Sequence, residues 1–261
     1  MKIKFDKYQG NGNDFIIIDD RMNRFNDDAD IVNRLCDRHF GIGADGLMLV
    51  RESETADFEM LYYNSDGALS TMCGNGGRCI AAFCYEHGIA GKKMRFSAVD
   101  GFHHAVIENK LKEGYYDVSL EMIDVEKVER RKNHFFLDTG SPHHVEFVQD
   151  LKDLNVYENG KKIRYSSAYE PEGTNVNFVE VFDDHIFVRT YERGVEDETL
   201  SCGTGVTASA IATFLKTGKK DFSIETPGGQ FSVNFQFDNN LFHNVWLRGP
   251  AVKVFTGEIN L

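Results

Sequence analysis

Short runs of β-branched and aromatic residues alternate along the chain with longer runs of helical periodicity. In the first half, apolar runs bounded by turn residues predict strands, and these runs cover residues 15–18, 47–50, 58–63, 94–99, 105–107 and 118–122. Apolar positions at helical spacing predict a short helix over 30–40 and a longer one over 74–87, which Gly88 ends. The chain therefore mixes helices and strands, and the longer helix lies between strands in sequence.

The second half repeats this order of features. Five of them recur at offsets of 127 to 129 residues: a turn before a strand at 145–148, polar residues at 191–193, Cys202 before a helix that runs to Gly218, a turn at 227–229 and a strand at 245–247. We therefore expect an α+β protein built from two copies of one unit, residues 1–124 and 125–261. The sequence contains four prolines and no obvious linker. The two halves are expected to pack across a cleft and to be related by an approximate two-fold axis.

Both of the longer predicted helices begin directly after a cysteine. Cys73 precedes Gly74-Asn75-Gly76-Gly77, and Cys202 precedes Gly203-Thr204-Gly205. The first N–H groups of a helix lack intrahelical partners and carry partial positive charge. They favour an anion, which can be a bound carboxylate or the thiolate of the cysteine itself. A buried helix-start cysteine without a function explains one such motif equally well, but the second copy favours a functional pair.

Composition and net charge limit the classes of binding partner that we expect for the protein. The 261 residues are 41% hydrophobic and 27% charged, which is enough to bury a full core. No apolar run approaches 18 residues, and the N-terminus is charged where a signal peptide is apolar, so we expect a cytoplasmic protein. The net charge of -12 argues against nucleic acid and against an anionic membrane surface. A small molecule is the expected ligand.

Five cysteines in a chain of this kind indicate free thiols rather than a disulfide framework. Cys36, Cys79 and Cys84 are expected to be buried as small hydrophobic residues. The spacing of the cysteines at 73, 79 and 84 matches no zinc pattern, so no metal site is expected. The chain also lacks a phosphate-binding loop and dinucleotide-binding glycine spacing, and no cofactor is expected.

Two thiols that approach one substrate from opposite sides favour a particular reaction. One thiolate removes a proton from a carbon, and the other thiol returns a proton to the opposite face, which inverts the centre. An ordinary thiol has a pKa of about 8.5, which a helix N-terminus lowers, so a thiolate and thiol pair is accessible near neutral pH. The exposed N–H groups of both helices would bind the adjacent carboxylate and stabilise the charge that develops on it.

The sequence closely resembles the diaminopimelate epimerase family over essentially the whole chain. The resemblance rests on six motifs: Gly12-Asn13-Asp14-Phe15, Asn64-Ser65-Asp66-Gly67, Cys73-Gly74-Asn75-Gly76-Gly77-Arg78, Pro142-His143, Tyr191-Glu192-Arg193-Gly194 and Cys202-Gly203-Thr204-Gly205. It implies a cofactor-independent enzyme that interconverts LL- and meso-diaminopimelate in lysine and peptidoglycan precursor synthesis, acting as a homodimer. It also implies two similar halves, each a mixed sheet curled like a barrel around a central helix, with the site between them. The last strand is expected to return to the first half.

The resemblance also implies roles for individual residues. Cys73 and Cys202 are the expected acid/base pair, and His143 and Glu192 are expected to support the chemistry near the reacting carbon. The reacting α-carboxylate is expected to bind the backbone of Gly74, Asn75, Gly203 and Thr204. The rest of the substrate is expected to contact Asn13, Asn64, Asn175, Glu192 and Arg193.

Several of these residues have simpler interpretations. Glu192 and Arg193 can form an exposed ion pair, which contributes little. His143 and His144 can be one buried and one solvated histidine on a strand. Two positions also depart from the family pattern. Ser141, a shorter donor, stands where the family usually has Asn, and Gly46, which has no side chain, stands where many members have Gln.

Other functions remain open at this stage. A related two-thiol racemase could act on proline, hydroxyproline or histidine. A thiol redox protein is disfavoured because its cysteines are usually close together in sequence, whereas Cys73 and Cys202 are 129 residues apart. A catalytically silent amino-acid-binding module is the third alternative, and isotope exchange at the α-carbon separates it from the enzymes.

Overall fold

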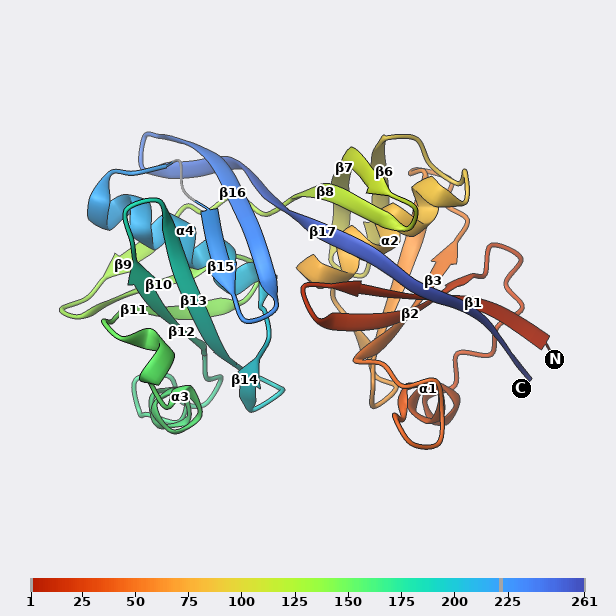
Figure 1. Ribbon diagram of the computed structural model, residues 1–261, viewed down its shortest axis with the longest axis horizontal. Helices are drawn as coiled ribbons and strands as arrows, with labels where there is room; N and C mark the ends of the chain where they lie inside the picture. The colour runs from red at the N-terminus through yellow and green to blue at the C-terminus, as the bar shows by residue number, and fades with distance from the viewer. Residues whose placement is uncertain (1, 221–222, 261) are drawn as a thin grey trace. The chain divides into compact units, whose positions relative to one another are not determined.

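The fold was obtained as a computed structural model, which describes residues 2–220 and 223–260 (Figure 1). The chain divides into two compact units. Unit 1 consists of Met1–Leu120 and Gly249–Leu261, and unit 2 consists of Glu121–Arg248. The division after Leu120 falls a few residues before the boundary expected near residue 125.

Unit 1 is a closed β-barrel. Each strand hydrogen-bonds to the next in the order β1, β2, β3, β4, β6, β7, β8, β17 and back to β1. The pairs β2–β3 and β4–β6 are parallel, and the other pairs in this ring are antiparallel. The strands are β1 (Lys2–Gly10), β2 (Asn13–Asp19), β3 (Gly46–Arg51), β4 (Phe58–Asn64), β6 (Lys93–Ala98), β7 (Gly101–Lys112), β8 (Tyr115–Glu121) and β17 (Leu241–Asn260), with the short β5 (Leu69–Ser70) beside β4.

The helix α2 (Gly74–Glu86) fills this barrel. It packs against β1, β2, β3 and β7, and every residue from position 74 to position 84 is buried. A helix with mostly apolar or small side chains on all its faces is stable only when it is enclosed. Figure 1 shows α2 among the strands of unit 1. The helix ends one residue before the predicted position, because His87 is the cap and Gly88 adopts a positive φ of 67°.

A second helix, α1 (Ala29–Cys36), adds an apolar layer to the sheet of unit 1. Val32 and Leu35 pack in one cluster with Ile16 and Leu47 of the parallel strands. The sequence predicted a helix over 30–40, which is too long. The chain leaves the helix at Asp37, where the backbone is extended and the carboxylate accepts the N–H groups of His39 and Phe40.

Unit 2 wraps a second row of strands around a second buried helix, α4 (Gly203–Thr217), which packs against β10, β11, β12, β13 and β16. The row runs β9, β10, β11, β12, β13, β15, β16, β17. Its strands are β9 (Val128–Arg130), β10 (His134–Asp138), β11 (Pro142–Phe147), β12 (Asn175–Val181), β13 (His185–Glu192), β14 (Asp197–Thr199), β15 (Ser223–Thr226) and β16 (Gly229–Asp238). The segment before β9 hydrogen-bonds to β17 through Met122 and Val125, which brings the ends of the row together.

The two units connect their strands in the same order. In unit 1 an antiparallel pair (β1, β2) is followed by a parallel neighbour (β3), an antiparallel one (β4), the buried helix, and a strand parallel to β4 (β6). In unit 2 the strands β10, β11, β12, β13, the helix α4 and β15 follow with the same directions. The predicted α+β class is confirmed, and the repeat in the sequence is accompanied by a repeat in topology.

Sequence patterns did not predict the helix α3 (Val156–Arg164), which follows the short 3-10 helix η1 (Leu151–Asp153). The segment is mostly polar, and only Val156 and Gly160 are buried. Gly160 lies directly against Tyr191, since a Cβ at Gly160 would be 2.3 Å from the Cβ of Tyr191. A narrow face of this helix packs on the sheet, because Val156 and Ile163 join a hydrophobic cluster with Val176 and Tyr191, and the side chain of Asn155 caps its N-terminus.

The final strand is shared by both units. Residues 241–248 of β17 pair with β16, residues 249–252 pair with β8, and the remainder pairs with β1. Among the described residues, none of the helices is both long enough and apolar enough to cross a membrane.

Candidate functional site

The residues predicted for the first half lie at one end of the barrel in unit 1. Asn13 is the first residue of β2, and Gly46 is the first residue of the parallel strand β3. Asn64 ends the antiparallel β4 and lies opposite Gly46. The first turn of α2 reaches the same end, because a Cβ on Gly76 would be 3.6 Å from the ring of Phe15.

Cys73 is the cap residue at the N-terminus of α2. Its backbone is extended (φ -94°, ψ 134°), its carbonyl accepts the N–H of Gly77 at 2.7 Å, and its side chain makes no capping hydrogen bond. Cys73 is partly exposed, whereas the helix that follows is buried. The thiol therefore lies at the positive end of a helix dipole, where the sequence predicted it.

Arg78 belongs to the Cys73 motif, although it was not predicted as a site residue. Its guanidinium is fully buried and donates to the carbonyl of Gly74 at 3.2 Å, to Asn75 Oδ1 at 3.0 Å and to Asn11 Oδ1 at 2.8 Å. Burial lowers the pKa of Arg78 to about 10, so the side chain stays charged at neutral pH. A fixed positive charge thus lies under the first turn of α2 and holds the turn in place.

Asn13 is held by a network of charged side chains. Its Nδ2 donates to Asp45 Oδ2 at 3.0 Å, and its buried Oδ1 has no hydrogen-bond partner within residues 2–220 and 223–260. The neighbouring Asp14 accepts hydrogen bonds from Arg38 at 2.7 Å and is paired with Lys7 at 2.6 Å. Burial raises the pKa of Asp14, but the hydrogen bonds from Arg38 and Lys7 outweigh it and hold the pKa at about 2.

Unit 2 gathers its predicted residues in the same way. Asn175 begins β12 opposite His143 of the parallel β11, and Glu192 ends the antiparallel β13. Cys202 caps the N-terminus of α4 with an extended backbone, is 6% exposed, and places its sulfur 3.4 Å from the hydroxyl of Thr204. The loop before β11 is tied to this helix start, because the hydroxyl of Thr139 donates to the carbonyl of Thr204 at 2.8 Å.

Ser141, Asn175 and Arg193 form one polar cluster. Asn175 Oδ1 accepts the backbone N–H of Arg193 at 2.8 Å, and Asn175 Nδ2 donates to Ser141 Oγ at 2.8 Å. Ser141 Oγ also accepts from Arg193 Nη2 at 3.4 Å. A hydroxyl that accepts two hydrogen bonds still carries one proton to donate, so Ser141 belongs to the cluster despite its departure from the family pattern.

The two adjacent histidines are both buried, so the simple alternative of one buried and one solvated ring is wrong. His143 is 0% exposed and His144 is 4% exposed. His144 Nδ1 lies 2.7 Å from the hydroxyl of Tyr169, and its ring stacks on His134 with the centroids 4.0 Å apart. The segment that carries Tyr169 covers the face of β11 that strand alternation alone would leave to solvent.

A side-chain hydrogen bond connects Glu192 to the segment that follows it in unit 2. Its Oε2 accepts the hydroxyl of Thr199 of β14 at 2.9 Å. Glu192 is partly exposed at the end of β13, next to Arg193. The hairpin from β13 to β14 therefore fixes the carboxylate before the chain reaches Cys202.

The remaining cysteines lie in a different environment. All five are free thiols, and burial raises the pKa of Cys36 and of Cys79 to about 12 and that of Cys84 well above its ordinary value. These three therefore stay protonated at neutral pH. In the part of the chain that the structure describes, no group of three or more His, Cys, Asp or Glu side chains is arranged to hold a metal ion.

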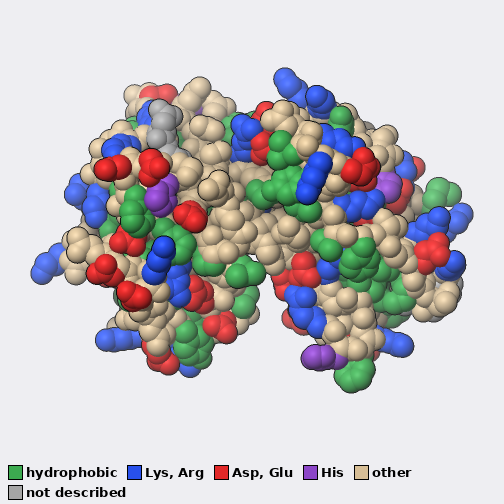
Figure 2. All heavy atoms as spheres, in the orientation of Figure 1, with side chains coloured by type: hydrophobic (Ala, Val, Ile, Leu, Met, Phe, Trp, Pro, Cys, Tyr) green, Lys and Arg blue, Asp and Glu red, His purple; other side chains and the backbone are tan. Residues whose placement is uncertain are grey.

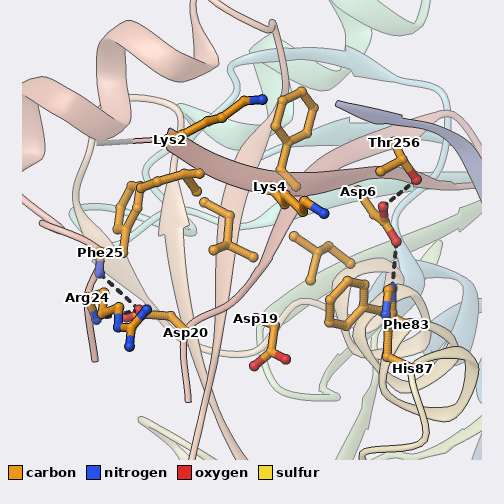
Figure 3. A pocket seen from close by; sticks show the side chains of 14 residues that line it. Lys2, Lys4, Asp6, Asp19, Asp20, Arg24, Phe25, Phe83, His87 and Thr256 are labelled. Atoms are coloured by element: carbon orange, nitrogen blue, oxygen red, sulfur yellow. Dashed lines mark hydrogen bonds and ion pairs between the residues drawn. The ribbon is translucent and has the colours of Figure 1, made fainter. Parts of the chain in front are cut away.

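A cavity of about 430 Å³ in unit 1 lies apart from these residues (Figure 3). It is lined by residues of β1, β2, α2 and β17, and none of them was predicted as a site residue. One of its lining carboxylates, Asp6, is already bound to the hydroxyl of Thr256 at 2.6 Å and to His87 at 2.8 Å. On the molecular face in Figure 2, acidic and basic side chains are interspersed over both units.

Comparisons with known proteins agree on one family. Residues 5–120 and 135–254 match the family model described as "Diaminopimelate epimerase". A protein of Flavobacterium psychrophilum named diaminopimelate epimerase is 50% identical over 262 residues, which cover 98% of this chain and 100% of that protein.

Solved structures show where the fold recurs. A phenazine biosynthesis protein of the PhzF family from Bacillus anthracis aligns with a TM-score of 0.78 at 16% identity and covers 100% of both chains. A hydroxyproline epimerase from Agrobacterium vitis aligns with a TM-score of 0.69 at 15% identity, covering 100% of this chain and 93% of that one. At such identities the likeness concerns the fold alone.

Proposed function

Because the chain belongs to the diaminopimelate epimerase family, we propose that it interconverts LL- and meso-diaminopimelate by inverting one α-carbon. The observation that carries the proposal is the 50% identity with the Flavobacterium psychrophilum protein over nearly the full length of both chains. In this role the enzyme serves lysine and peptidoglycan precursor synthesis.

Cys73 and Cys202 are the proposed acid/base pair. One thiolate takes the proton from the α-carbon and becomes a thiol, while the other thiol delivers its proton to the opposite face and becomes a thiolate. Protons are exchanged and no electrons are transferred between the reactants, so the step needs no redox cofactor. The proposal requires both thiols to reach the same α-carbon from opposite faces. The shared strand order and the capping position of both cysteines support it.

The two helix starts are proposed to bind the reacting α-carboxylate through the backbone of Gly74, Asn75, Gly203 and Thr204. Helix N-terminal N–H groups favour an anion, and their preorganised dipoles stabilise the negative charge that develops as the proton leaves. The buried charge of Arg78 lies under one of these turns and acts in the same direction.

The distal amino-acid group is proposed to bind the polar cluster of unit 2, with Asn13 and Asn64 completing the contacts. Arg193 offers a planar pair of donors that matches a carboxylate. Ser141 would add its remaining O–H, which supplies a donor where the family usually has an Asn. His143 and Glu192 are assigned to the neighbourhood of the reacting carbon.

A homodimer in the cytoplasm completes the proposal. Sedimentation equilibrium over a range of protein concentrations tests the dimer, and a monomer at all concentrations would remove this part of the proposal without affecting the activity.

Incubation of the purified protein with LL-diaminopimelate in deuterated water, without added cofactor, tests the function. We expect deuterium at the α-carbon and formation of the meso isomer. Proline, hydroxyproline, histidine and lysine serve as parallel substrates. Exchange confined to one of these would assign the chain to a different racemase, and no exchange with any of them would leave a binding module.

A further inference from the structure

Three buried residues on adjacent strands of unit 2 form a hydrogen-bonded chain. They are His143 on β11, Asn177 on β12 and Thr190 on β13, and each is at most 3% exposed. The Nδ2 of Asn177 lies 3.0 Å from His143 Nδ1 and 3.0 Å from the carbonyl oxygen of His144. The Oδ1 of Asn177 accepts the hydroxyl of Thr190 at 2.9 Å.

The carbonyl of His144 settles which way the amide of Asn177 points. A backbone carbonyl only accepts hydrogen bonds, so the amide atom beside it has to be the NH₂ group and not the oxygen. This NH₂ group has two hydrogens. One is donated to the carbonyl of His144 and the other to Nδ1 of His143, which is therefore the unprotonated nitrogen of that ring.

The environment of His143 keeps the ring neutral. Burial and, to a smaller extent, the positive charge of Arg193 lower its pKa to about 3, although the hydrogen bond with Asn177 acts in the opposite direction. A neutral ring with an accepting Nδ1 carries its proton on Nε2. Within residues 2–220 and 223–260, this buried Nε2 has no hydrogen-bond partner. A buried donor without an acceptor destabilises the fold, and a bound acceptor would satisfy it.

The same network touches the start of α4. A Cβ on Gly205 would lie 2.3 Å from Asn177 Oδ1 and 3.3 Å from the Cβ of Cys202. The amide of Asn177 therefore packs against the helix turn that follows Cys202, and only a glycine at position 205 leaves room for it. The hydrogen-bonded chain from Thr190 to His143 belongs to the candidate site and not to a remote part of the core.

We propose that Asn177 is a positioning residue that holds His143 in its Nε2–H tautomer, so that His143 acts as a neutral hydrogen-bond donor to an anionic acceptor and not as a proton-abstracting base. The role in the reaction rests on the proposed function. The tautomer does not, because it is a property of the protein without substrate.

Nitrogen-15 NMR tests the tautomer directly. Two-bond ¹H–¹⁵N correlations of the labelled protein distinguish a protonated from an unprotonated ring nitrogen, and the His143 signals are those lost in His143→Gln. We expect Nδ1 to be unprotonated and Nε2 protonated, unchanged from about pH 5 to about pH 8. A proton on Nδ1, or a titration in this range, would overturn the proposal whether or not the protein is an epimerase.

Asn177→Asp tests the positioning role. A carboxylate at this place accepts a hydrogen bond from Nδ1–H, so the proton should move from Nε2 to Nδ1, and kcat should fall by about tenfold or more with little change in KM. Asn159→Asp, which adds the same charge at an exposed position of α3, is the control. A folded Asn177→Asp protein with an unchanged tautomer and kcat would refute the role of Asn177.

Two substitutions at position 143 separate a donor from a base. Gln offers an amide N–H but takes up no proton at neutral pH, whereas Leu offers neither. For a donor, His143→Gln should keep kcat within about tenfold of the wild type, and His143→Leu should lose about a hundredfold or more. Equal losses in both variants, on the order of 10²- to 10⁴-fold, would show a base and contradict the proposal. A wild type that does not epimerise diaminopimelate would refute the proposed function instead, and the NMR result would still stand.

Discussion

At the scale of single residues, the cysteines differ in where they stand relative to the helices. Cys73 and Cys202 are cap residues, just before the first turn of a helix, while Cys79 and Cys84 lie inside α2 and Cys36 ends α1. Burial keeps the latter three protonated. Helix N-termini stabilise thiolates, so the two cap positions are the ones suited to proton transfer.

We expect Cys73→Ala and Cys202→Ala each to abolish epimerisation, because each thiol would serve one face of the α-carbon and neither can replace the other. Cys84→Ala, a truncation inside the buried part of α2, should lower stability and leave kcat nearly unchanged. Circular dichroism establishes folding, and the deuterium assay measures turnover. A folded Cys73→Ala or Cys202→Ala protein with more than a few per cent of wild-type turnover would refute the two-base assignment.

Arg193 is expected to determine specificity for a dicarboxylic substrate. A Lys at this position cannot reproduce the bidentate contact with a carboxylate, which is worth about 2–4 kcal/mol in a desolvated site, or roughly 30- to 1,000-fold in kcat/KM. Arg193→Lys should therefore impair diaminopimelate far more than it impairs the already poor substrate lysine, which has no distal carboxylate. Equal impairment of both substrates would show that Arg193 serves the reacting end or the fold.

Asp14 gives the stability of the protein a defined dependence on acid. Its pKa in the folded protein, about 2, lies below the ordinary value of 3.8. The carboxylate therefore stabilises the fold above about pH 4, and this contribution is lost as the pH falls towards 2. The shift corresponds to at most about 2.5 kcal/mol. The neighbouring Asp45 has the opposite effect on how stability depends on pH, because burial raises its pKa.

Urea denaturation between pH 4 and pH 2 measures this contribution. We expect the free energy of unfolding to fall less steeply with acid in Asp14→Asn than in the wild type. Asp124→Asn, at an exposed position, is the control and should keep the wild-type slope. Identical slopes in all three proteins would show that the ion pairs of Asp14 do not stabilise the fold.

At the scale of elements, Gly46 shows why one departure from the family pattern is tolerated here. A Cβ at the start of β3 would lie 2.5 Å from the ring of Tyr62 and 2.7 Å from the carbonyl oxygen of Tyr63, both on the paired strand β4. The ring of Tyr62 thus occupies the space that a side chain at position 46 would need. Position 46 therefore contributes no side-chain contact to a substrate.

Gly46→Ala should consequently destabilise the protein by about 1–3 kcal/mol, since β3 and β4 cannot separate without loss of their hydrogen bonds. Gly91→Ala is a matched control, because a Cβ at Gly91 would approach nothing closer than 3.8 Å. Its effect should stay within about 0.5 kcal/mol. Thermal denaturation of both variants measures the loss of stability. Equal unfolding midpoints would mean that the ring of Tyr62 moves aside at little cost.

At the scale of the whole molecule, β17 is the strand on which both units depend. Its second part closes the barrel of unit 1 by pairing with β8 on one side and β1 on the other. Side chains reinforce this pairing, since Asp6 of β1 is bound by Lys253 at 2.9 Å and by Thr256 at 2.6 Å. Without it, β1 would become an exposed edge strand, which favours aggregation.

Removal of residues 253–261 should therefore open the barrel around α2. We expect a large loss of stability, faster proteolysis within unit 1 and concentration-dependent aggregation, each measured against the full chain. Thr256→Val, which removes one hydroxyl but leaves the strand paired, should cost only about 1–2 kcal/mol. A truncated protein as stable as Thr256→Val would show that the barrel does not need its last strand.

The sequence by itself determined the local elements and the sites where chemistry is possible. The strands near residues 15–18 and 58–63, the helix after Cys73 and the helix after Cys202 follow from periodicity, turn residues and glycines, which act over a few neighbouring positions. The repeat was also visible, because both copies carry the same local signals in the same order. Family resemblance supplied the roles of Asn175 and Arg193.

The tertiary structure decided what depends on residues far apart in the chain. The closure of the barrel pairs residues 115–118 with 249–252, and no local pattern encodes such a distant pairing. Polar residues that sequence alone would place at the surface, such as Arg78 and Asn177, are buried because their hydrogen-bond partners come from other elements. The protonation state of His143 could likewise not be predicted from the sequence. The atoms that surround its ring come from strands and a helix that only folding brings together.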